Sequence, residues 1–195
     1  MMEAKQDIYL IGVGGQGIGL LSEVLLRAAD HAGFPVRGVD THGLSQRGGT
    51  VVSYVRIGPK AHSPLVQPGC ADMVVALERN EAWRGLCSHL KDGGCLVYYD
   101  TEWQPLMVRL GREPRLETPV IEQECLLRGI KEVRVGPAVL RDNRMQNMVL
   151  LAAIASNKLI PGVEVNHYEQ ALEDLLRAES LEKNVALFRE KLGLV

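Results

Sequence analysis

The sequence predicts an α/β fold of three layers, in which a mostly parallel sheet is covered by helices on both faces. From Ile8 to about Leu90, short apolar runs typical of buried strands alternate with segments whose apolar residues recur at helical spacing. A glycine-rich turn follows the first apolar run directly, where such sheets pass from strand to helix. The 195 residues, 46% of them hydrophobic, can bury one sizeable core. We therefore expect a Rossmann-like architecture and a single domain, residues 1–195.

The first strand, turn and helix are the clearest elements. Asp7–Ile11 is predicted as a short strand, Gly12–Gly17 as the turn and Ile18–Ala29 as a helix. Anions bind at such a turn, because free backbone N–H groups and the positive end of the helix dipole meet there. A glycine turn can also serve only the close packing of strand and helix. The residues predicted to bind a cofactor are Gly12, Gly14, Gly15, Gln16 and Gly17.

The second strand, Pro35–Val39, ends at Asp40. Gly12, Gly14 and Gly17 fit the pattern G-x-G-x-x-G, and Asp40 follows at roughly the ~20-residue interval at which dinucleotide-binding folds place a ribose-binding acid. This pattern favours a stand-alone protein that binds NAD or FAD as an alternative function. Asp40 also has a simpler explanation, since acids at strand ends often cap the following turn.

A second polar loop, Thr41–Gly49, leads into the strand Thr50–Ile57, which is rich in β-branched residues. Polar side chains crowd into this loop, and its glycines permit unusual backbone angles. Such loops commonly carry function, although a solvated turn would have a similar composition. The residues predicted to contact the substrate or a partner are His42, Gln46, Arg47, Gly48 and Gly49. We expect the two loops to lie at one edge of the sheet.

The rest of the chain continues the alternation and then becomes helical. Lys60–Gly69 and Thr101–Pro119 contain several prolines and are predicted to be loops, and Lys91–Gly94 is predicted to end a helix. Glu78 begins that helix and is expected to complement its dipole. The remaining predicted strands are Asp72–Leu77, Cys95–Asp100 and Glu132–Val135. The remaining predicted helices are Glu78–Leu90, Glu122–Gly129, Arg141–Lys158, Asn166–Arg177 and Ser180–Lys191.

Charge and composition argue against several kinds of partner. The chain has 22 basic and 24 acidic side chains and a formal charge of −2, without a basic stripe, so nucleic acid is not an expected ligand. Aromatic residues make up 5% of the chain, too few for base-stacking platforms. The first residues lack the apolar core of a secretion signal, and no run approaches the ~18 apolar residues that span a bilayer. We expect a cytoplasmic protein without a membrane segment.

Motifs for several kinds of catalysis are missing. The cysteines, at positions 70, 87, 95 and 125, lie far apart, whereas iron–sulfur and structural zinc sites need closely spaced thiolates. We interpret them as small buried hydrophobic side chains. The motifs G-x-S-x-G, H-E-x-x-H and G-x-x-x-x-G-K-[ST] do not occur, which argues against a serine hydrolase, a zinc protease and a nucleotide-triphosphate motor. No catalytic or metal-binding residue is assigned to this chain.

The two loops together resemble a known family, the gamma-type domain of pyruvate/2-oxoacid:ferredoxin oxidoreductases. Within it, the chain is most similar to the small (beta) subunits of indolepyruvate ferredoxin oxidoreductases. Both loops occur in the order and at the spacing of that family, and the resemblance covers nearly the whole chain. The residues that carry it are Gly12-Val-Gly-Gly-Gln-Gly17, then His42-Gly43, then Gln46-Arg47-Gly48-Gly49 before the strand Thr50–Arg56.

The resemblance implies a subunit that completes a larger enzyme. Such enzymes oxidatively decarboxylate a 2-oxo acid, here an aryl-pyruvate, to an acyl-CoA and reduce ferredoxin. Thiamine diphosphate, Mg and 4Fe-4S clusters are expected in a large (alpha) subunit, because this chain lacks the G-D-G-plus-Asn segment and the cysteine set that hold them. Coenzyme A is the expected co-substrate. The two loops would meet the large subunit near its thiamine site, with Arg47 as a fixed charge for a carboxylate or phosphate.

Two further interpretations stay open from the residues alone. The turn Gly12–Gly17 also fits the adenylating domains of the ubiquitin-activating type, although the additional basic residues and cysteine of those domains have no counterpart that can be placed here. A scaffold without a ligand site would have the same fold. Mutations in its two loops would leave catalysis intact.

Overall fold

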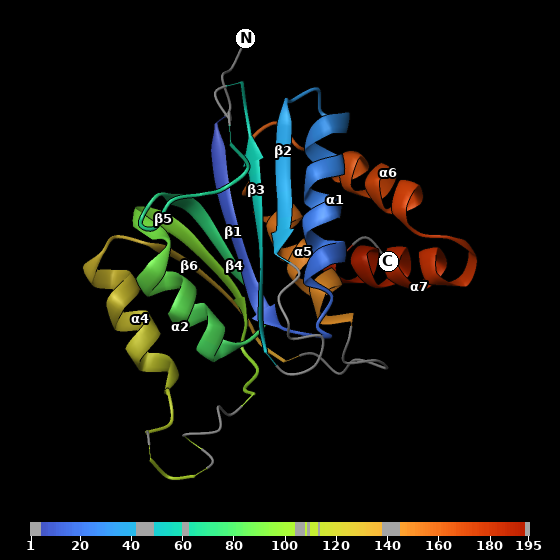
Figure 1. Ribbon diagram of the computed structural model, residues 1–195. Helices are drawn as coiled ribbons and strands as arrows, with labels where there is room; N and C mark the ends of the chain where they lie inside the picture. Colours follow the sequence, from blue (N-terminus) through green and yellow to red (C-terminus); the bar gives the residue numbers. More distant parts are fainter. Residues whose placement is uncertain are drawn as a thin grey trace.

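A six-stranded sheet forms the middle layer of the protein, in the order β2-β3-β1-β4-β5-β6 (Figure 1). The computed structural model describes residues 5–41, 49–59, 63–103, 108, 110–112, 114–137 and 145–193. The strands are β1 Gln6–Val13, β2 Val36–Thr41, β3 Thr50–Ile57, β4 Ala71–Ala76, β5 Leu90–Tyr99 and β6 Lys131–Val135. The helices are α1 Ile18–His31, α2 Arg79–Ser88, α4 Thr118–Leu127, α5 Gln146–Ser156, α6 Val165–Leu175 and α7 Ala178–Leu192. The predicted α/β fold is confirmed.

Four of the strands are parallel, as predicted, but β3 runs against both of its neighbours. Strands β1, β4, β5 and β6 pair in parallel, whereas β3 pairs antiparallel with β1 and with β2. Only residues 42–49 separate β2 from β3, and a crossover to a parallel strand needs about a dozen residues or more. The chain therefore returns directly, and β3 lies between β1 and β2.

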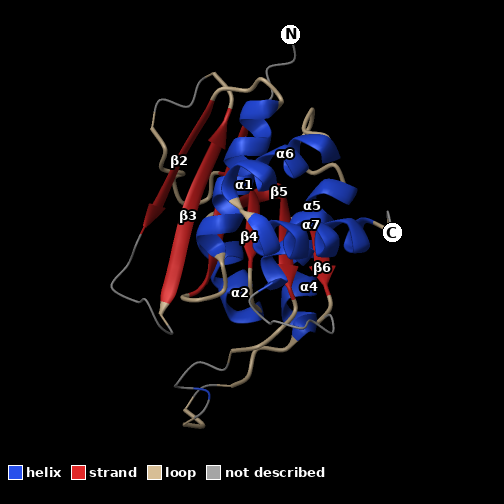
Figure 2. Ribbon diagram, turned by 90° about the vertical axis from the view of Figure 1, so that its right-hand side faces the viewer, coloured by secondary structure: helices blue, strands red, loops and turns tan. Residues whose placement is uncertain are grey.

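Helices cover both faces of the sheet (Figures 1 and 2). Helices α1, α5, α6 and α7 pack on one face, and α2 and α4 on the other (Figure 1). Alternate side chains of β1 enter the two cores: Ile8 and Leu10 face the first layer of helices, and Tyr9 and Ile11 face the second. None of the helices in the described ranges combines the length and apolar character that a membrane crossing requires.

Helices α1 and α2 follow the neighbouring strands β1 and β4 and lie on opposite faces of the sheet. Open α/β sheets bind ligands at such a switch point, outside the carboxyl ends of the strands. We call this side of the molecule the carboxyl edge. The antiparallel strand β3 begins there, since Thr50 pairs with Val13 at the end of β1.

The predicted boundary between α2 and β5 is wrong. Lys91–Gly94, predicted to end a helix, belongs to β5, which begins at Leu90. The register between β4 and β5 shifts here, so these residues form an irregular bulge. Gly93 adopts a φ of +70°, and a Cβ at Gly94 would lie 3.0 Å from the carbonyl oxygen of Asp72. The glycines that indicated a helix end therefore permit a bulged strand.

The later helices start close to their predicted positions. Helix α4 begins at Thr118 rather than Glu122. Pro119 is tolerated in its first turn, because the N–H that proline lacks has no partner within the helix at that position. The predicted beginning of α5, residues 141–144, lies outside the described residues. Helix α6 packs on α1, and α7 packs on α5, which completes the larger core.

His89 follows α2, and its ring stacks on Tyr9 of β1. The ring centroids are 3.8 Å apart and the planes differ by 4°. The hydroxyl of Ser88 lies 2.8 Å from Nδ1 of His89. Burial lowers the pKa of His89 below its ordinary value.

We expect acid to weaken the fold through His89. Because its pKa is lower in the folded chain, the unfolded chain binds the proton more readily. The stabilisation is fully present above the unfolded pKa of about 6.5 and is lost as the pH falls through the folded pKa. Urea unfolding of the wild type and His89→Gln at about pH 7.5 and about pH 5.5 checks this. The wild type's advantage should shrink at the lower pH, and an equal advantage at both would contradict the prediction.

Candidate functional site

The glycine turn joins β1 to α1 at the carboxyl edge. Gly15 and Gly17 adopt φ values of +99° and +83°, which residues with a side chain rarely adopt. Gly17 immediately precedes α1, and the first turn of that helix contains no acidic residue. The positive end of the helix dipole is therefore not neutralised by the helix's own side chains.

The side chain of Gln16 folds back over the end of β1. Its Oε1 accepts a 2.7 Å hydrogen bond from the N–H of Val13, and the N–H of Gln16 donates to the Val13 carbonyl at 3.2 Å. A Cβ at Gly12 would lie 2.8 Å from that Oε1, so only glycine leaves room for it. Gln16 is 6% exposed, and its Nε2 has no hydrogen-bond partner among the described residues. The oxygen therefore shapes the turn, whereas the nitrogen is buried.

A cavity of about 190 Å³ lies beside the turn. It brings together the glycines and Asp40, which the sequence had linked by spacing alone. Asp40 lies within β2 rather than after it, and its Oδ1 accepts a 2.8 Å hydrogen bond from the hydroxyl of Ser22 on α1. The Oγ of Ser53 is fully buried and has no hydrogen-bond partner among the described residues. The lining residues are Val13, Gly14, Gly15, Gly17, Ile18, Gly19, Asp40, Val51 and Ser53.

The second loop returns to the glycine turn. The N–H of Gly14 donates a 2.9 Å hydrogen bond to the carbonyl of Gly49. Of the residues predicted in this loop, Gly49 is thus brought against the glycine turn. His42, Gln46, Arg47 and Gly48 lie outside the described residues, so their roles stay predictions.

Asn147, at the start of α5, ties this helix to the glycine turn. Its Nδ2 donates to the carbonyl of Gly17 at 3.2 Å, and its Oδ1 accepts from the N–H of Met148 at 2.9 Å. The side chain is almost fully buried. Sequence analysis had placed Asn147 only in a helix, because nothing local to it indicates a contact so far along the chain.

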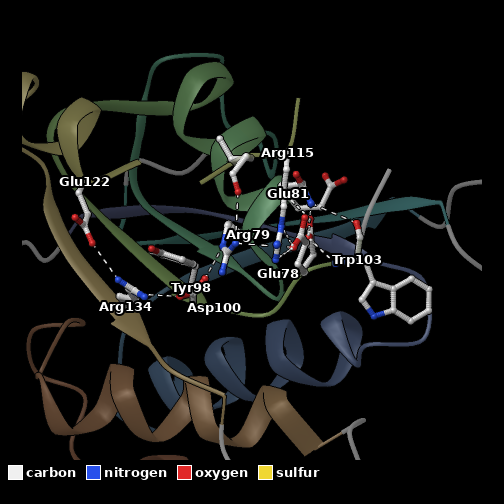
Figure 3. Close-up of polar contacts among 12 residues, drawn as sticks. Glu78, Arg79, Glu81, Tyr98, Asp100, Trp103, Arg115, Glu122 and Arg134 are labelled. Carbon is white, nitrogen blue, oxygen red and sulfur yellow. Dashed lines mark hydrogen bonds and ion pairs between the residues drawn. The ribbon is translucent and has the colours of Figure 1, made fainter. Parts of the chain in front are cut away.

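Glu78 occupies the carboxyl end of β4 and caps α2 (Figure 3). Its carboxylate accepts hydrogen bonds from the N–H of Glu81, from Nδ2 of Asn80 at 3.2 Å and from the N–H of Trp103 at 3.4 Å. Burial raises the pKa of Glu78, and these hydrogen bonds oppose the rise. Glu78, expected to complement the helix dipole, therefore also caps α2 by accepting a hydrogen bond from the N–H of Glu81. The same carboxylate holds the backbone at Trp103 through a hydrogen bond.

Glu81 connects α2 to β3. Its Oε1 accepts a 3.2 Å hydrogen bond from the hydroxyl of Thr50, and Nε of Arg84 lies 3.1 Å from its Oε2. Burial raises the pKa of Glu81, while the Arg84 guanidinium lowers it. Because Thr50 follows Gly49 directly, Glu81 reaches the end of the second loop.

Asp100 holds two arginines at the end of β5 (Figure 3). Its Oδ1 and Oδ2 each lie 2.7 Å from an arginine Nε, of Arg79 and Arg134 respectively. Arg134 also pairs with Glu122 on α4 at 3.0 Å. Sequence analysis missed this network. The available signal was an acid directly after the apolar run of a strand, the same position that Glu78 has after β4.

The four cysteines differ in burial. Cys70 and Cys87 are exposed, Cys95 is half-buried and Cys125 is buried. The interpretation as buried side chains is therefore right for Cys125 and wrong for Cys70 and Cys87. Burial raises the pKa of Cys125 to about 11, so its thiol stays protonated at neutral pH. Within the described part of the chain, no three His, Cys, Asp or Glu side chains are placed to hold a metal ion.

Comparison with known protein families identifies this arrangement. The family model for pyruvate ferredoxin/flavodoxin oxidoreductase matches residues 7–192. The chain belongs to this family. Its glycine turn, its second loop and both layers of helices all lie within the matched range.

Relatives within the pyruvate ferredoxin/flavodoxin oxidoreductase family match over almost their whole length. The chain is 30% identical to indolepyruvate oxidoreductase subunit IorB of Pyrococcus horikoshii, over 94% of this chain and 93% of the relative. It is 30% identical to the same-named subunit of Methanothermobacter thermautotrophicus, over 96% of each. It is 28% identical to the 2-oxoglutarate synthase subunit KorC of that organism, over 97% of this chain and 94% of the relative.

Solved structures share the fold. The gamma subunit of a keto/oxoacid ferredoxin oxidoreductase from Geobacter sulfurreducens superimposes with a TM-score of 0.66 at 19% identity, covering 97% of both chains. A 2-oxoglutarate:ferredoxin oxidoreductase from Magnetococcus marinus, solved with 2-oxoglutarate, coenzyme A and succinyl-CoA, has a TM-score of 0.66 at 20% identity, over 98% of this chain and 31% of that one. The stand-alone dinucleotide-binding alternative is not favoured, since the relatives at 28–30% identity are named as subunits of indolepyruvate oxidoreductase and 2-oxoglutarate synthase.

Proposed function

We propose that this chain is the small subunit of an indolepyruvate (2-oxoacid):ferredoxin oxidoreductase. The proposed reaction is oxidative decarboxylation of an aryl-pyruvate to an acyl-CoA, with transfer of two electrons to ferredoxin. Relatives named as indolepyruvate oxidoreductase subunits match over more than nine-tenths of this chain, which supports the assignment. The observation that carries the site is the Gly14 to Gly49 hydrogen bond, because it joins the two loops of the family resemblance.

The reactive cofactors belong to a large partner subunit in this proposal. Thiamine diphosphate, Mg and 4Fe-4S clusters need ligand sets that the sequence does not contain. The small subunit then completes the catalytic pocket and is inactive alone. We place the complex in the cytoplasm, the reducing compartment that suits four unpaired cysteines.

The glycine turn has the chemistry to hold part of coenzyme A. Its positive-φ glycines and the first turn of α1 present amides for a phosphate, without an acid in that turn. Gln16 adds a buried Nε2 that has no hydrogen-bond partner in the described part of the chain. Asp40 lines the cavity beside the turn, and its carboxylate repels any anion that enters this cavity. The cavity therefore suits hydroxyl or amide groups of the ligand.

Arg47→Ala is expected to lower kcat/KM of the reconstituted two-subunit complex roughly 10- to 100-fold, because charge-assisted hydrogen bonds contribute ~1.5–3 kcal/mol. The measurement is indolepyruvate-dependent reduction of ferredoxin, with coenzyme A and indolepyruvate varied in turn. Arg27→Ala, an exposed cation in the middle of α1, is the control and should leave the kinetics unchanged.

Two outcomes would count against these roles. If Arg47→Ala leaves subunit affinity, KM and kcat unchanged, the role of Arg47 is wrong. If the isolated chain oxidises indolepyruvate unaided, or associates with no thiamine-containing subunit, the proposed function is wrong.

A further inference from the structure

A second hollow, of about 780 Å³, lies on the opposite side of the sheet from α1, between α2 and the segment that leads into α4. We call it the α2–α4 groove. Its described lining is mainly apolar, with two cations at its border. The side chains that define it are Trp83, Val108, Leu116, Val120, Arg84 and Arg115.

The two arginine side chains of the groove stay exposed although each is paired with a carboxylate. Arg84 and Arg115 have side chains 59% and 53% exposed, and they pair with Glu81 and Glu102. The two carboxylates are only 7% and 9% exposed, so they lie on the buried side of each pair. No acidic residue is among the described side chains that line the groove. A partner that fits would supply carboxylates to the outward N–H donors of the guanidinium groups.

An exposed aromatic side chain extends this surface. Trp103 is 58% exposed, and Figure 3 shows its indole pointing away from the buried network. The backbone N–H of Trp103 donates to Glu78, and the backbone carbonyl of Trp103 accepts from Nδ2 of Asn80 at 3.3 Å. Asn80 also lines the groove. Exposed tryptophans with a fixed backbone are well suited to anchor a protein interface, because little conformational freedom is lost on binding.

We propose that the α2–α4 groove and Trp103 bind an amphipathic segment of the large subunit, with apolar side chains in the groove and carboxylates facing Arg84 and Arg115. The charge and apolar lining select this chemistry. Position favours this partner, because Glu81 contacts both Arg84 at the groove and Thr50, the residue that follows Gly49. This inference rests on the proposed function, which supplies the large subunit as the partner.

The test compares two exposed apolar residues of the same helix. Val120 lines the groove and is 43% exposed, whereas Leu127 is 75% exposed and does not line it. Val120→Asp is expected to raise the Kd for the purified large subunit roughly tenfold or more, because it places a carboxylate where the partner's apolar and acidic groups bind. Leu127→Asp should leave the Kd unchanged. Circular dichroism of both variants checks that α4 is folded.

Hydrogen exchange of the wild-type complex gives an independent measurement. Amides of α2 and of residues 114–120 are expected to gain protection on association, and those of α6 are not. If Val120→Asp binds the large subunit as tightly as the wild type and Leu127→Asp do, the inference is overturned. The proposed function would still stand in that case. An unchanged Kd with slower ferredoxin reduction by Val120→Asp would also overturn the inference, since the groove would then receive the electron acceptor. A wild type that does not bind the large subunit would overturn both.

Discussion

Asp100→Ala is expected to destabilise the folded chain by about 3 kcal/mol, one of the two largest effects anticipated here. Asp100 is almost fully buried and holds Arg79, whose side chain is 13% exposed. Removing one member of a buried pair typically costs about 3–5 kcal/mol, because the remaining charge loses its compensation. The lower end applies, since Arg134 is 44% exposed and stays solvated. Urea unfolding should show a lower midpoint at an unchanged slope.

Asp92→Ala is the matched control for this change. Asp92 pairs with Arg128 at the same Nε to carboxylate distance, 2.7 Å, but its side chain is 79% exposed. Surface ion pairs contribute about 0–1 kcal/mol, so the control should lose little stability. Equal losses for the two variants would show that burial of Asp100 does not set its contribution.

The fold was largely predictable because its signals are local. Apolar runs located β1, β3 and α1, and the glycine spacing placed the turn between β1 and α1. The antiparallel direction of β3 was missed, although residues 42–49 are too few for a crossover. The bulge at the start of β5 was missed for a different reason. Gly93 and Gly94 satisfy the rules for a helix end and for a bulged strand equally well.

The candidate site was only partly predictable because several of its contacts join distant segments. The motif G-x-G-x-x-G identifies the turn, but not the bond from Asn147 to Gly17, 130 residues away. The Asp100 network likewise joins Arg79, Asp100 and Arg134 from three separate elements. Patterns along the sequence indicate periodicity and turns. These polar contacts depend instead on which strands become neighbours in the sheet.

Gly12→Ala is the second change with a large expected effect, a loss of about 2–4 kcal/mol in the free energy of unfolding. The new Cβ would lie 2.8 Å from Oε1 of Gln16 and 3.1 Å from Cβ of Leu77. Gln16 would have to move and release the buried N–H of Val13. Overpacking costs about 1–3 kcal/mol, and an unsatisfied buried N–H costs a further ~1–3 kcal/mol.

Gly136→Ala is the matched control, because a Cβ at Gly136 meets no atom within 4 Å and its φ is not positive. Urea unfolding should show little change for this variant. If Gly12→Ala proves equally stable, the folded-back Gln16 does not hold the turn in place. If it is destabilised but still folded at the assay temperature, kcat/KM of the reconstituted complex should also fall. The reason is that the side chain of Gln16 packs over Gly12 and shapes the turn. A methyl group at Gly12 would move Gln16, and with it the turn amides proposed to contact the ligand.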